Sequence, residues 1–262
     1  MCLIVVAWRA RAGLPLAVAA NRDEWRERPA EAAHWWPDHP DLFAGRDLQA
    51  GGTWMGITRE GRFAAVTNYR DPSEKRSTAL SRGGLVTEFL LGADSPARYL
   101  ANLSARAREY NAFNLILGDG ESLFYYGSRE GEPRAIEPGV HGLSNHLLDE
   151  PWPKVVHGRA RMQAALATSD PAPLLFEMLS DRAVAPDEAL PATGVGIEWE
   201  RRLAASLITG AEYGTRASTV LTVSSKGDVA MEERTRDAAG EVSRTVRERF
   251  ELQSGVLLRA GG

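Results

Sequence analysis

Hydrophobic residues are concentrated near the start of the chain, where two almost uninterrupted apolar runs flank the turn sequence Ala12-Gly13-Leu14-Pro15. The runs extend from Leu3 to Trp8 and from Leu16 to Ala20, and the turn between them predicts a β-hairpin. A strand with one exposed face alternates apolar and polar residues, and these runs do not. The pattern therefore predicts a sheet that is covered by another layer on each face.

After the first hairpin the pattern predicts loops, then a second hairpin, then two helices. The segment Arg28 to Gly52 is rich in Pro, Gly, Trp and His, and we interpret it as long ordered loops. A second hairpin is predicted over Thr53 to Thr58 and Phe63 to Asn68. Ser81 is expected to cap a helix that buries Val86, Phe89 and Leu90, and Ser95 with Pro96 is expected to start a helix that buries Tyr99, Leu100 and Leu103.

The second half of the chain continues with strands, then helices, then strands. This order lacks the alternating βαβ period, so it favours an α+β fold of stacked mixed or antiparallel sheets flanked by helices. Because we find no linker or repeat, residues 1–262 are expected to form a single domain. The predicted strands are Phe113 to Gly118, Leu123 to Tyr126, Ala217 to Ser224, Val229 to Glu233 and Val242 to Leu252, and the predicted helices are Pro151 to Thr168 and Pro171 to Leu179.

Composition narrows the classes of function. The formal net charge is −4 and the arginines are interspersed with acidic residues, so no nucleic-acid partner is indicated. Arg9, Arg11, Gly13 and Pro15 interrupt the first apolar stretch, which argues against a signal peptide, and no stretch is long enough to span a membrane. A single cysteine excludes an internal disulfide. We therefore expect a cytoplasmic protein.

That single cysteine is Cys2, directly after the initiator methionine. Removal of Met1 would leave one residue with both a thiol and a free α-amino group. A thiolate is a strong nucleophile, and an α-amine with a pKa of about 7.7 to 8.0 can take and return its proton near neutral pH. The alternative is a small apolar residue that opens a buried strand.

Polar residues at the ends of strands are the other candidates for chemistry. Asn21-Arg22-Asp23-Glu24 ends the second strand, and in a hairpin this end lies beside Cys2. Arg22 could favour the thiolate and Asp23 could orient the α-ammonium, or both could form a surface ion pair. Asn68 and Asn145 offer side-chain amides to an oxyanion. Arg216 could bind a carboxylate or phosphate of a ligand, or pair with a local acidic residue.

Aromatic residues and histidines complete the candidates. Trp35, Trp36 and Trp54 could wall an apolar ligand pocket, or pack in the core. His34 with His39, and His141 with His146, stand five residues apart, which is not the ligand spacing of a helix. We therefore expect no metal site, although any of the five histidines could ligate haem.

The motifs named above, taken together, resemble those of the NRDE family, the homologues of the transport and Golgi organisation protein of animals. The resemblance covers nearly the whole chain. It rests on Met1-Cys2, Asn21 to Glu24, Gly51 to Ile57, Thr67-Asn68-Tyr69, Arg82-Gly83 through Leu90, Tyr110-Asn111 through Leu115, Gly142 through Asn145 with Pro151-Trp152, and Tyr213-Gly214-Thr215-Arg216.

This resemblance implies a four-layer αββα sandwich similar to the N-terminal nucleophile hydrolases, in particular the penicillin V acylase and bile salt hydrolase group. By analogy with that group, Cys2 would be the nucleophile, its own amine the base, and Arg22 and Asp23 would poise them. Asn68 and Asn145 would serve the oxyanion, and Arg216 would complete the site. The family is also associated with haem trafficking and with lipid or acyl-CoA homeostasis, and fold alone does not carry activity.

Two functions therefore remain open. The first is a hydrolase or acyl transferase in which Cys2 attacks an amide or acyl thioester of a small acylated metabolite, with no cofactor required. The second is a carrier that holds haem or an acyl-CoA or lipid ligand in the same cleft, with the tryptophans against its apolar part and Arg22 or Arg216 on its charged group.

Overall fold

The two apolar runs at the start of the chain form neighbouring strands, β1 (Cys2–Arg11) and β2 (Leu14–Trp25). Leu3 packs against helices on one face of this sheet, whereas Ile4 packs against a second sheet on the other face. Because side chains alternate along a strand, a strand buried on both faces needs apolar residues at successive positions. The predicted burial on two faces is confirmed.

The computed structural model describes residues 2–74 and 76–253, so Met1, whose removal the sequence suggests, lies outside the described residues. Within this part of the chain, two sheets are stacked and every pairing between their named strands is antiparallel. The six-stranded sheet has the order β10 (Gly139–Leu143), β1, β2, β11 (Tyr213–Val223), β12 (Asp228–Arg236) and β13 (Val242–Glu251). The seven-stranded sheet has the order β3 (Ala30–Trp36), β4 (His39–Asp47), β5 (Met55–Thr58), β6 (Phe63–Asn68), β7 (Phe113–Gly118), β8 (Leu123–Gly127) and β9 (Arg134–Ala135).

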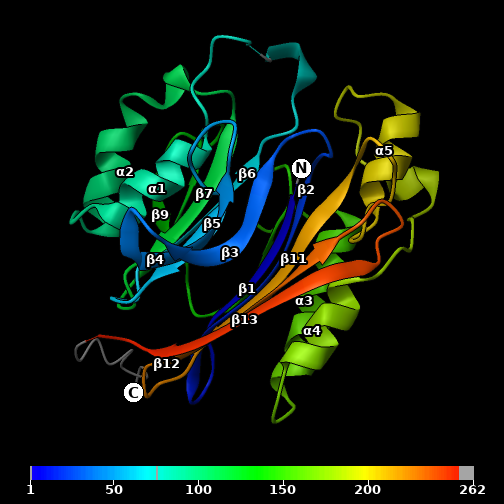
Figure 1. The fold of residues 1–262 in the computed structure, drawn as a ribbon. Coiled ribbons are helices and arrows are strands. Elements are labelled where there is room, and N and C mark those ends of the chain that lie inside the picture. The colour runs from blue at the N-terminus through cyan, green and yellow to red at the C-terminus, as the bar shows by residue number, and fades with distance from the viewer. Residues whose placement is uncertain (1, 75, 254–262) are drawn as a thin grey trace.

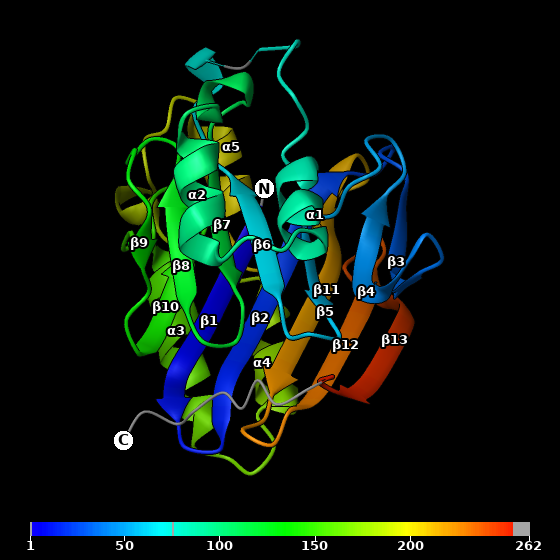
Figure 2. The same ribbon diagram turned by 90° about the vertical axis from the view of Figure 1, so that its left-hand side faces the viewer.

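Helices cover the outer face of each sheet (Figures 1 and 2). The helices α1 (Gly83–Leu91) and α2 (Pro96–Ser104) pack on the seven-stranded sheet, and α3 (Pro153–Leu166) and α4 (Ala172–Leu179) pack on the six-stranded one. The predicted α+β fold with four αββα layers is thus confirmed. A fifth helix, α5 (Ile197–Ala204), lies at the same end of the molecule as the start of β1 (Figure 1). None of the described helices is long and apolar enough to cross a membrane.

The segment Arg28 to Gly52, interpreted as loops, contains β3 and β4, so that prediction was wrong. The register of their pairing shifts between Glu31 and His34 and again between Trp35 and Trp36. Such irregularities break the period-two pattern by which a strand is recognised. β3 is also at the edge of its sheet, where exposed polar residues are tolerated.

Helix starts were predicted with mixed success. Ser95 caps α2, because its side-chain oxygen accepts the backbone N–H of Arg98, as predicted. Ser81 does not cap α1, since only its main-chain carbonyl accepts a hydrogen bond, from Gly84. Strands β9 and β10 and helix α5 have no counterpart in the prediction, and all of them are short.

Candidate active site

Cys2 and Arg22 are direct partners across the β1–β2 pair. The hairpin predicted that the end of β2 lies beside Cys2, but it did not distinguish Arg22 from Asp23. On its other side β2 pairs with β11, where Asp23 lies opposite Thr215. Cys2 is therefore on a central strand, within a layer that is held by antiparallel strands on both sides. This placement fixes the backbone around the thiol.

Alternation along β2 decides which neighbour shares a face with the thiol. Arg22 points between the sheets, as Cys2 does, and its guanidinium stacks on the Trp54 ring at 4.5 Å and lies 3.7 Å from the Asp47 carboxylate. The Asp23 side chain points to the opposite, helix-covered face, but its backbone N–H hydrogen-bonds the thiol. Arg22 and Asp23, although adjacent in the sequence, thus point to opposite faces of β2.

The Asp23 carboxylate is buried beside two groups that stabilise its ionised form. Thr215 Oγ1 donates a hydrogen bond of 2.6 Å to Asp23 Oδ1, and Lys154 of α3 contributes a positive charge. Burial nevertheless raises the pKa of Asp23 above its ordinary value. The carboxylate therefore depends on these partners to remain charged.

Lys154 is a functional candidate that the sequence analysis missed. It is buried, its Nζ donates a hydrogen bond of 2.9 Å to the Leu203 carbonyl, and burial lowers its pKa to about 8. Asp23 opposes this shift. A lysine among the buried positions of a helix, next to Val155, was the available signal, since lysine is rarely buried without a partner.

A buried ion pair adjoins this cluster. Arg70 Nη1 lies 2.5 Å from Glu200 Oε2, and Glu200 also accepts a hydrogen bond from the Thr193 hydroxyl. The Arg70 guanidinium stacks over the Trp152 ring at 4.7 Å. The charge of Arg70 also acts on the pKa values of Asp23 and Lys154. Helix α5, which carries Glu200, therefore contacts the residue that links it electrostatically to this cluster.

The Cys2 residue reaches a cleft on one side, but burial raises the pKa of its thiol. The backbone N–H of Asp23 and the charge of Arg22 act in the opposite direction. The sequence had suggested a thiol of lowered pKa because Arg22 and an α-ammonium on Cys2 itself would both favour the thiolate. The lowered pKa stays a prediction for the form from which Met1 has been removed.

The two asparagines are brought together but in different roles. Asn68 lines the cleft beside Cys2, and no hydrogen bond engages its side-chain amide within the described part of the chain. Asn145 is fully buried, and its Nδ2 donates a hydrogen bond of 2.9 Å to the Asn68 carbonyl. Ser144, next to it, donates through its hydroxyl to the Cys2 carbonyl at 3.1 Å. The segment after β10 thus ties β6 to β1.

Arg216 does not line the cleft, although the sequence suggested that it completes the site. The β2–β11 register shifts between Thr215 and Ala217, which leaves Arg216 as the extra residue of a β-bulge. Its Nη1 donates hydrogen bonds to the main-chain carbonyls of Trp25, Arg26 and Arg28. The side chain therefore meets main-chain carbonyls rather than the local carboxylate that was one of its two predicted partners.

Of the three predicted pocket tryptophans, only Trp54 lines the cleft. Trp36 is buried among residues of α1 and the seven-stranded sheet, and Trp35 packs against Phe43 and Phe250. Their bulk fills the core, which is the usual place for large aromatic side chains. No histidine lines the cleft, and residues 2–74 and 76–253 contain no group of three potential metal-binding side chains.

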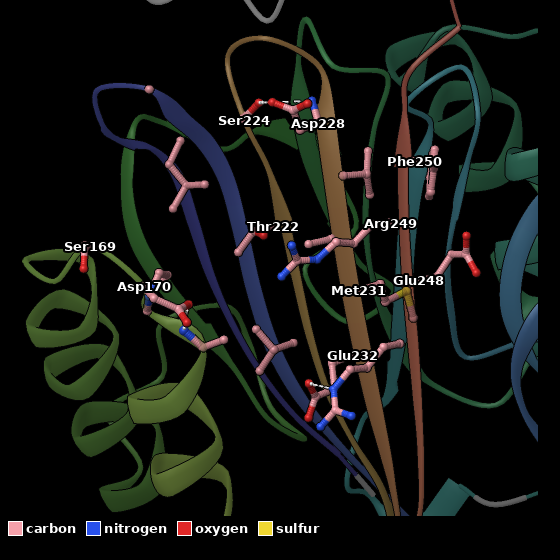
Figure 3. A pocket seen from close by; sticks show the side chains of 18 of the residues that line it. Ser169, Asp170, Thr222, Ser224, Asp228, Met231, Glu232, Glu248, Arg249 and Phe250 are labelled. Carbon is pink, nitrogen blue, oxygen red and sulfur yellow. Dashed lines mark hydrogen bonds and ion pairs between the residues drawn. The ribbon is translucent and has the colours of Figure 1, made fainter.

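The cleft beside Cys2 has a volume of about 430 Å³ and lies between the two sheets and the segment 76–83. A larger hollow, of about 970 Å³, lies elsewhere, on the outer face of β12 and β13 beside the α3–α4 connection (Figure 3). There Glu232 already pairs with Arg234 and Arg247. None of the predicted site residues lines that larger hollow, so the smaller cleft is the candidate site.

These features define a class of protein: an αββα sandwich in which a cysteine next to the N-terminus lines a cleft between two antiparallel sheets. The chain belongs to the Transport and Golgi organisation 2 family, whose profile matches residues 1–238. A Bos taurus Transport and Golgi organization protein 2 homolog is 39% identical over 239 residues, which are 84% of this chain and 86% of the relative. The Homo sapiens homolog is 36% identical over 237 residues, with the same coverage.

Solved structures show more distant likenesses. A mutant of the conjugated bile acid hydrolase from Clostridium perfringens matches over 98% of both chains, with a TM-score of 0.49 and 7% identity. The Caenorhabditis elegans ortholog of N-acylethanolamine-hydrolyzing acid amidase matches 84% of this chain and 92% of its own, with a TM-score of 0.39 and 8% identity.

Proposed function

We propose that the protein is a hydrolase whose nucleophile is the thiol of Cys2, exposed as the N-terminal residue by removal of Met1. Its substrate is a small acylated metabolite with an amide or acyl thioester bond. The observation that carries the proposal is the position of Cys2, which has an open cleft on one side and the buried Asp23, Thr215 and Lys154 cluster behind its strand. A purely structural cysteine does not need a charged cluster of this kind.

The first half of the reaction forms an acyl-enzyme. The α-amine of Cys2 takes the thiol proton, and the thiolate attacks the acyl carbon, so that a C–S bond forms and the carbonyl electrons move to oxygen. The Asn68 amide donates a hydrogen bond to this oxyanion, since no other partner engages that amide within residues 2–74 and 76–253. The α-ammonium then protonates the leaving amine or thiolate as its bond to carbon breaks.

The second half releases the acyl group. Water loses a proton to the α-amine and attacks the thioester, the C–S bond breaks, and the returning proton restores the thiol. Asp23 accepts a hydrogen bond from the α-ammonium whenever that group is charged. Lys154 holds Asp23 ionised, because its positive charge offsets the cost of a buried carboxylate.

The remaining residues hold these groups in place. Asn145 fixes the backbone that carries Asn68, and Arg22 keeps a positive charge on the thiol's face of the sheet. Arg216 holds the segment that follows β2. No cofactor enters the proposed steps.

A carrier of haem or of acyl-CoA or lipid ligands in the same cleft is the second candidate. It depends on an apolar wall, and of the three tryptophans predicted to form one only Trp54 lines the cleft. Seven of the 20 residues that line it are charged. The hydrolase is therefore the function that the site supports better.

Mass spectrometry of the intact protein tests the proposal. Because the chain has one cysteine, any thiol adduct is at Cys2. We expect purified protein to lack Met1 and to gain one acyl group when it is mixed with an activated acyl thioester, then to lose that group over time. Cys2→Ala should gain none.

The control separates chemistry from binding. Cys2→Ala should bind a substrate within about tenfold of the wild-type affinity, because the thiol acts mainly in the transition state. Wild-type protein that binds haem or acyl-CoA tightly, yet hydrolyses a broad panel of amides and thioesters no faster than Cys2→Ala, would establish the carrier instead.

A further inference from the structure

The cleft beside Cys2 is lined by an excess of positive charge. Arg22, Arg28, Arg76 and Arg82 line it, against the carboxylates Asp23, Glu24 and Asp47. Asp23 belongs to the cluster behind β2, where Lys154 accompanies it. This leaves four arginines facing two carboxylates in a space of about 430 Å³.

Two of these arginines already have an acidic partner. Asp47 Oδ2 accepts a hydrogen bond of 2.6 Å from Arg28 Nε and lies 3.7 Å from Arg22 Nη2. Arg22 also lies 3.9 Å from Glu24. These contacts make Arg22 and Arg28 part of the cleft wall, held by Asp47.

Arg82 and Arg76 have no such partner. Arg82 Nη1 donates to the Ala112 carbonyl at 3.2 Å, and Arg76 Nη2 donates to the carbonyls of Arg108 and Tyr110. Throughout residues 2–74 and 76–253, no carboxylate lies within 4.0 Å of either guanidinium. A carbonyl accepts a hydrogen bond but supplies no countercharge.

Arg82 also interacts electrostatically with the thiol. It is half-buried, burial lowers its pKa, and the charges that oppose this shift are those of Glu24 and Cys2. The guanidinium therefore lies within electrostatic range of the sulfur. A desolvated guanidinium without a carboxylate favours an anion from outside, and its planar donors suit carboxylate or phosphate oxygens.

We infer that the substrate carries a carboxylate or phosphate close to the bond that is cleaved, and that Arg82 binds this anion. The inference rests on the proposed function and names its substrate class. Because the cleft is small, it can enclose only a small part of the substrate. Arg76, which also lines the cleft, adds to the attraction of the anion.

Four compounds of similar size test this substrate class. N-acetylethanolamine is neutral, N-acetylglycine and N-acetyl-O-phosphoethanolamine carry a carboxylate or a phosphate on the amine side, and N-succinylethanolamine carries a carboxylate on the acyl side. Calorimetric titration of Cys2→Ala measures binding without turnover. At least one anionic compound should bind about tenfold or more tightly than the neutral one, because a charged hydrogen bond contributes about 1.5 to 3 kcal/mol.

Variants assign the preference to Arg82. Arg82→Gln, combined with Cys2→Ala, should abolish the preference for the anion, whereas Arg82→Lys should retain part of it. Arg98→Gln removes an arginine that is exposed and paired with Asp94, and it should change nothing. Circular dichroism of each variant confirms that it is folded.

The outcomes distinguish this inference from the function on which it rests. If all four compounds bind alike, or none binds, or Arg82→Gln leaves the preference intact, the anion site is overturned, whether or not Cys2-dependent hydrolysis is found. If anions bind through Arg82 but wild-type protein hydrolyses a broad panel of anionic and neutral amides and thioesters no faster than Cys2→Ala, the anion site stands and the hydrolase fails. Which anionic compound binds best decides between a carboxylate and a phosphate.

Discussion

Thr215 and Asp23, which are 192 residues apart in the sequence, are joined by a hydrogen bond of 2.6 Å from the threonine hydroxyl to the aspartate carboxylate. They lie opposite each other in the β2–β11 pair, and both are buried. The same hydroxyl accepts the backbone N–H of Ile208 at 2.9 Å. One side chain thus links the carboxylate behind Cys2 to the segment that precedes β11.

Replacing Thr215 with Val keeps the shape of the side chain and removes the hydroxyl. The Asp23 carboxylate then loses a donor, and a buried polar group that loses a hydrogen bond costs about 1 to 3 kcal/mol. We expect the free energy of unfolding in urea to fall by this amount, together with the rate of Cys2 acylation. Thr215→Ser, which keeps the hydroxyl, should lose less than half as much. Equal effects of the two substitutions would show that the methyl group, not the hydrogen bond, matters.

The pKa of Lys154 predicts a dependence of stability on pH. Burial lowers that pKa from 10.5 to about 8 in the folded protein. Between these values the unfolded chain binds more protons than the folded one, so the free energy of unfolding rises with pH. The gain is about 1.4 kcal/mol per pH unit, or about 2 kcal/mol between pH 8 and pH 9.5.

Urea unfolding of wild type and Lys154→Met at both pH values isolates this contribution, because the variant keeps every other titrating group. The wild type should gain stability relative to the variant as the pH rises. A constant difference between the two proteins would mean that Lys154 titrates at its ordinary pKa.

Removal of Met1 is expected to lower the pKa of the Cys2 thiol. While Met1 is attached, burial raises that pKa, so the rate of iodoacetamide labelling should reach its midpoint above about pH 8.5. In the processed form the α-ammonium is on the same residue as the thiol and favours the thiolate. Its labelling midpoint should therefore be lower.

Protein prepared in both forms allows the comparison, and each form unfolded in urea serves as its control. The unfolded controls measure how much of the difference the adjacent α-ammonium causes without the fold. Identical midpoints in the folded forms would contradict a functional link between the amine and the thiol.

The buried Arg70–Glu200 pair should show strong coupling. Removal of one partner leaves the other charge buried, which typically costs 3 to about 5 kcal/mol. We expect Arg70→Met and Glu200→Met each to lose stability of this order, and the double variant to lose less than the sum of the two. Denaturant unfolding of all four proteins measures the coupling, and additive losses would mean that the two charges do not interact.

Much of the fold could be predicted because its central strands are buried on two faces. Leu3 to Trp8 needs no tertiary information to be recognised as such a strand, and the hairpin places the end of β2 beside Cys2. Whether Arg22 or Asp23 faces the thiol could not be counted, because the register shifts between Trp8 and Arg11. Trp36 was harder to place, since a tryptophan in a polar segment has the same composition whether it lines a pocket or packs under a helix. Only the stacking of α1 on the sheet decides between them.

The candidate site was less predictable than the fold, because its partners come from distant segments. Lys154 meets Asp23 only once α3 lies on the outer face of the six-stranded sheet. The proposed role of Arg82 depends on which arginines of the cleft lack a carboxylate partner, and that cannot be counted along the chain. Local patterns thus indicated Cys2 as the proposed nucleophile, whereas its surroundings depend on tertiary packing.

The bulge at Arg216 makes the length of β11 as important as its composition. With the extra residue in place, Thr215 pairs with Asp23 while Ala217 pairs with Arg22. Deleting one residue would force either half of the strand to slide by one position, which reverses the faces of every side chain in that half. A substitution of Arg216 should therefore be tolerated better than its deletion. Related sequences should show substitutions at this position but no single-residue gaps.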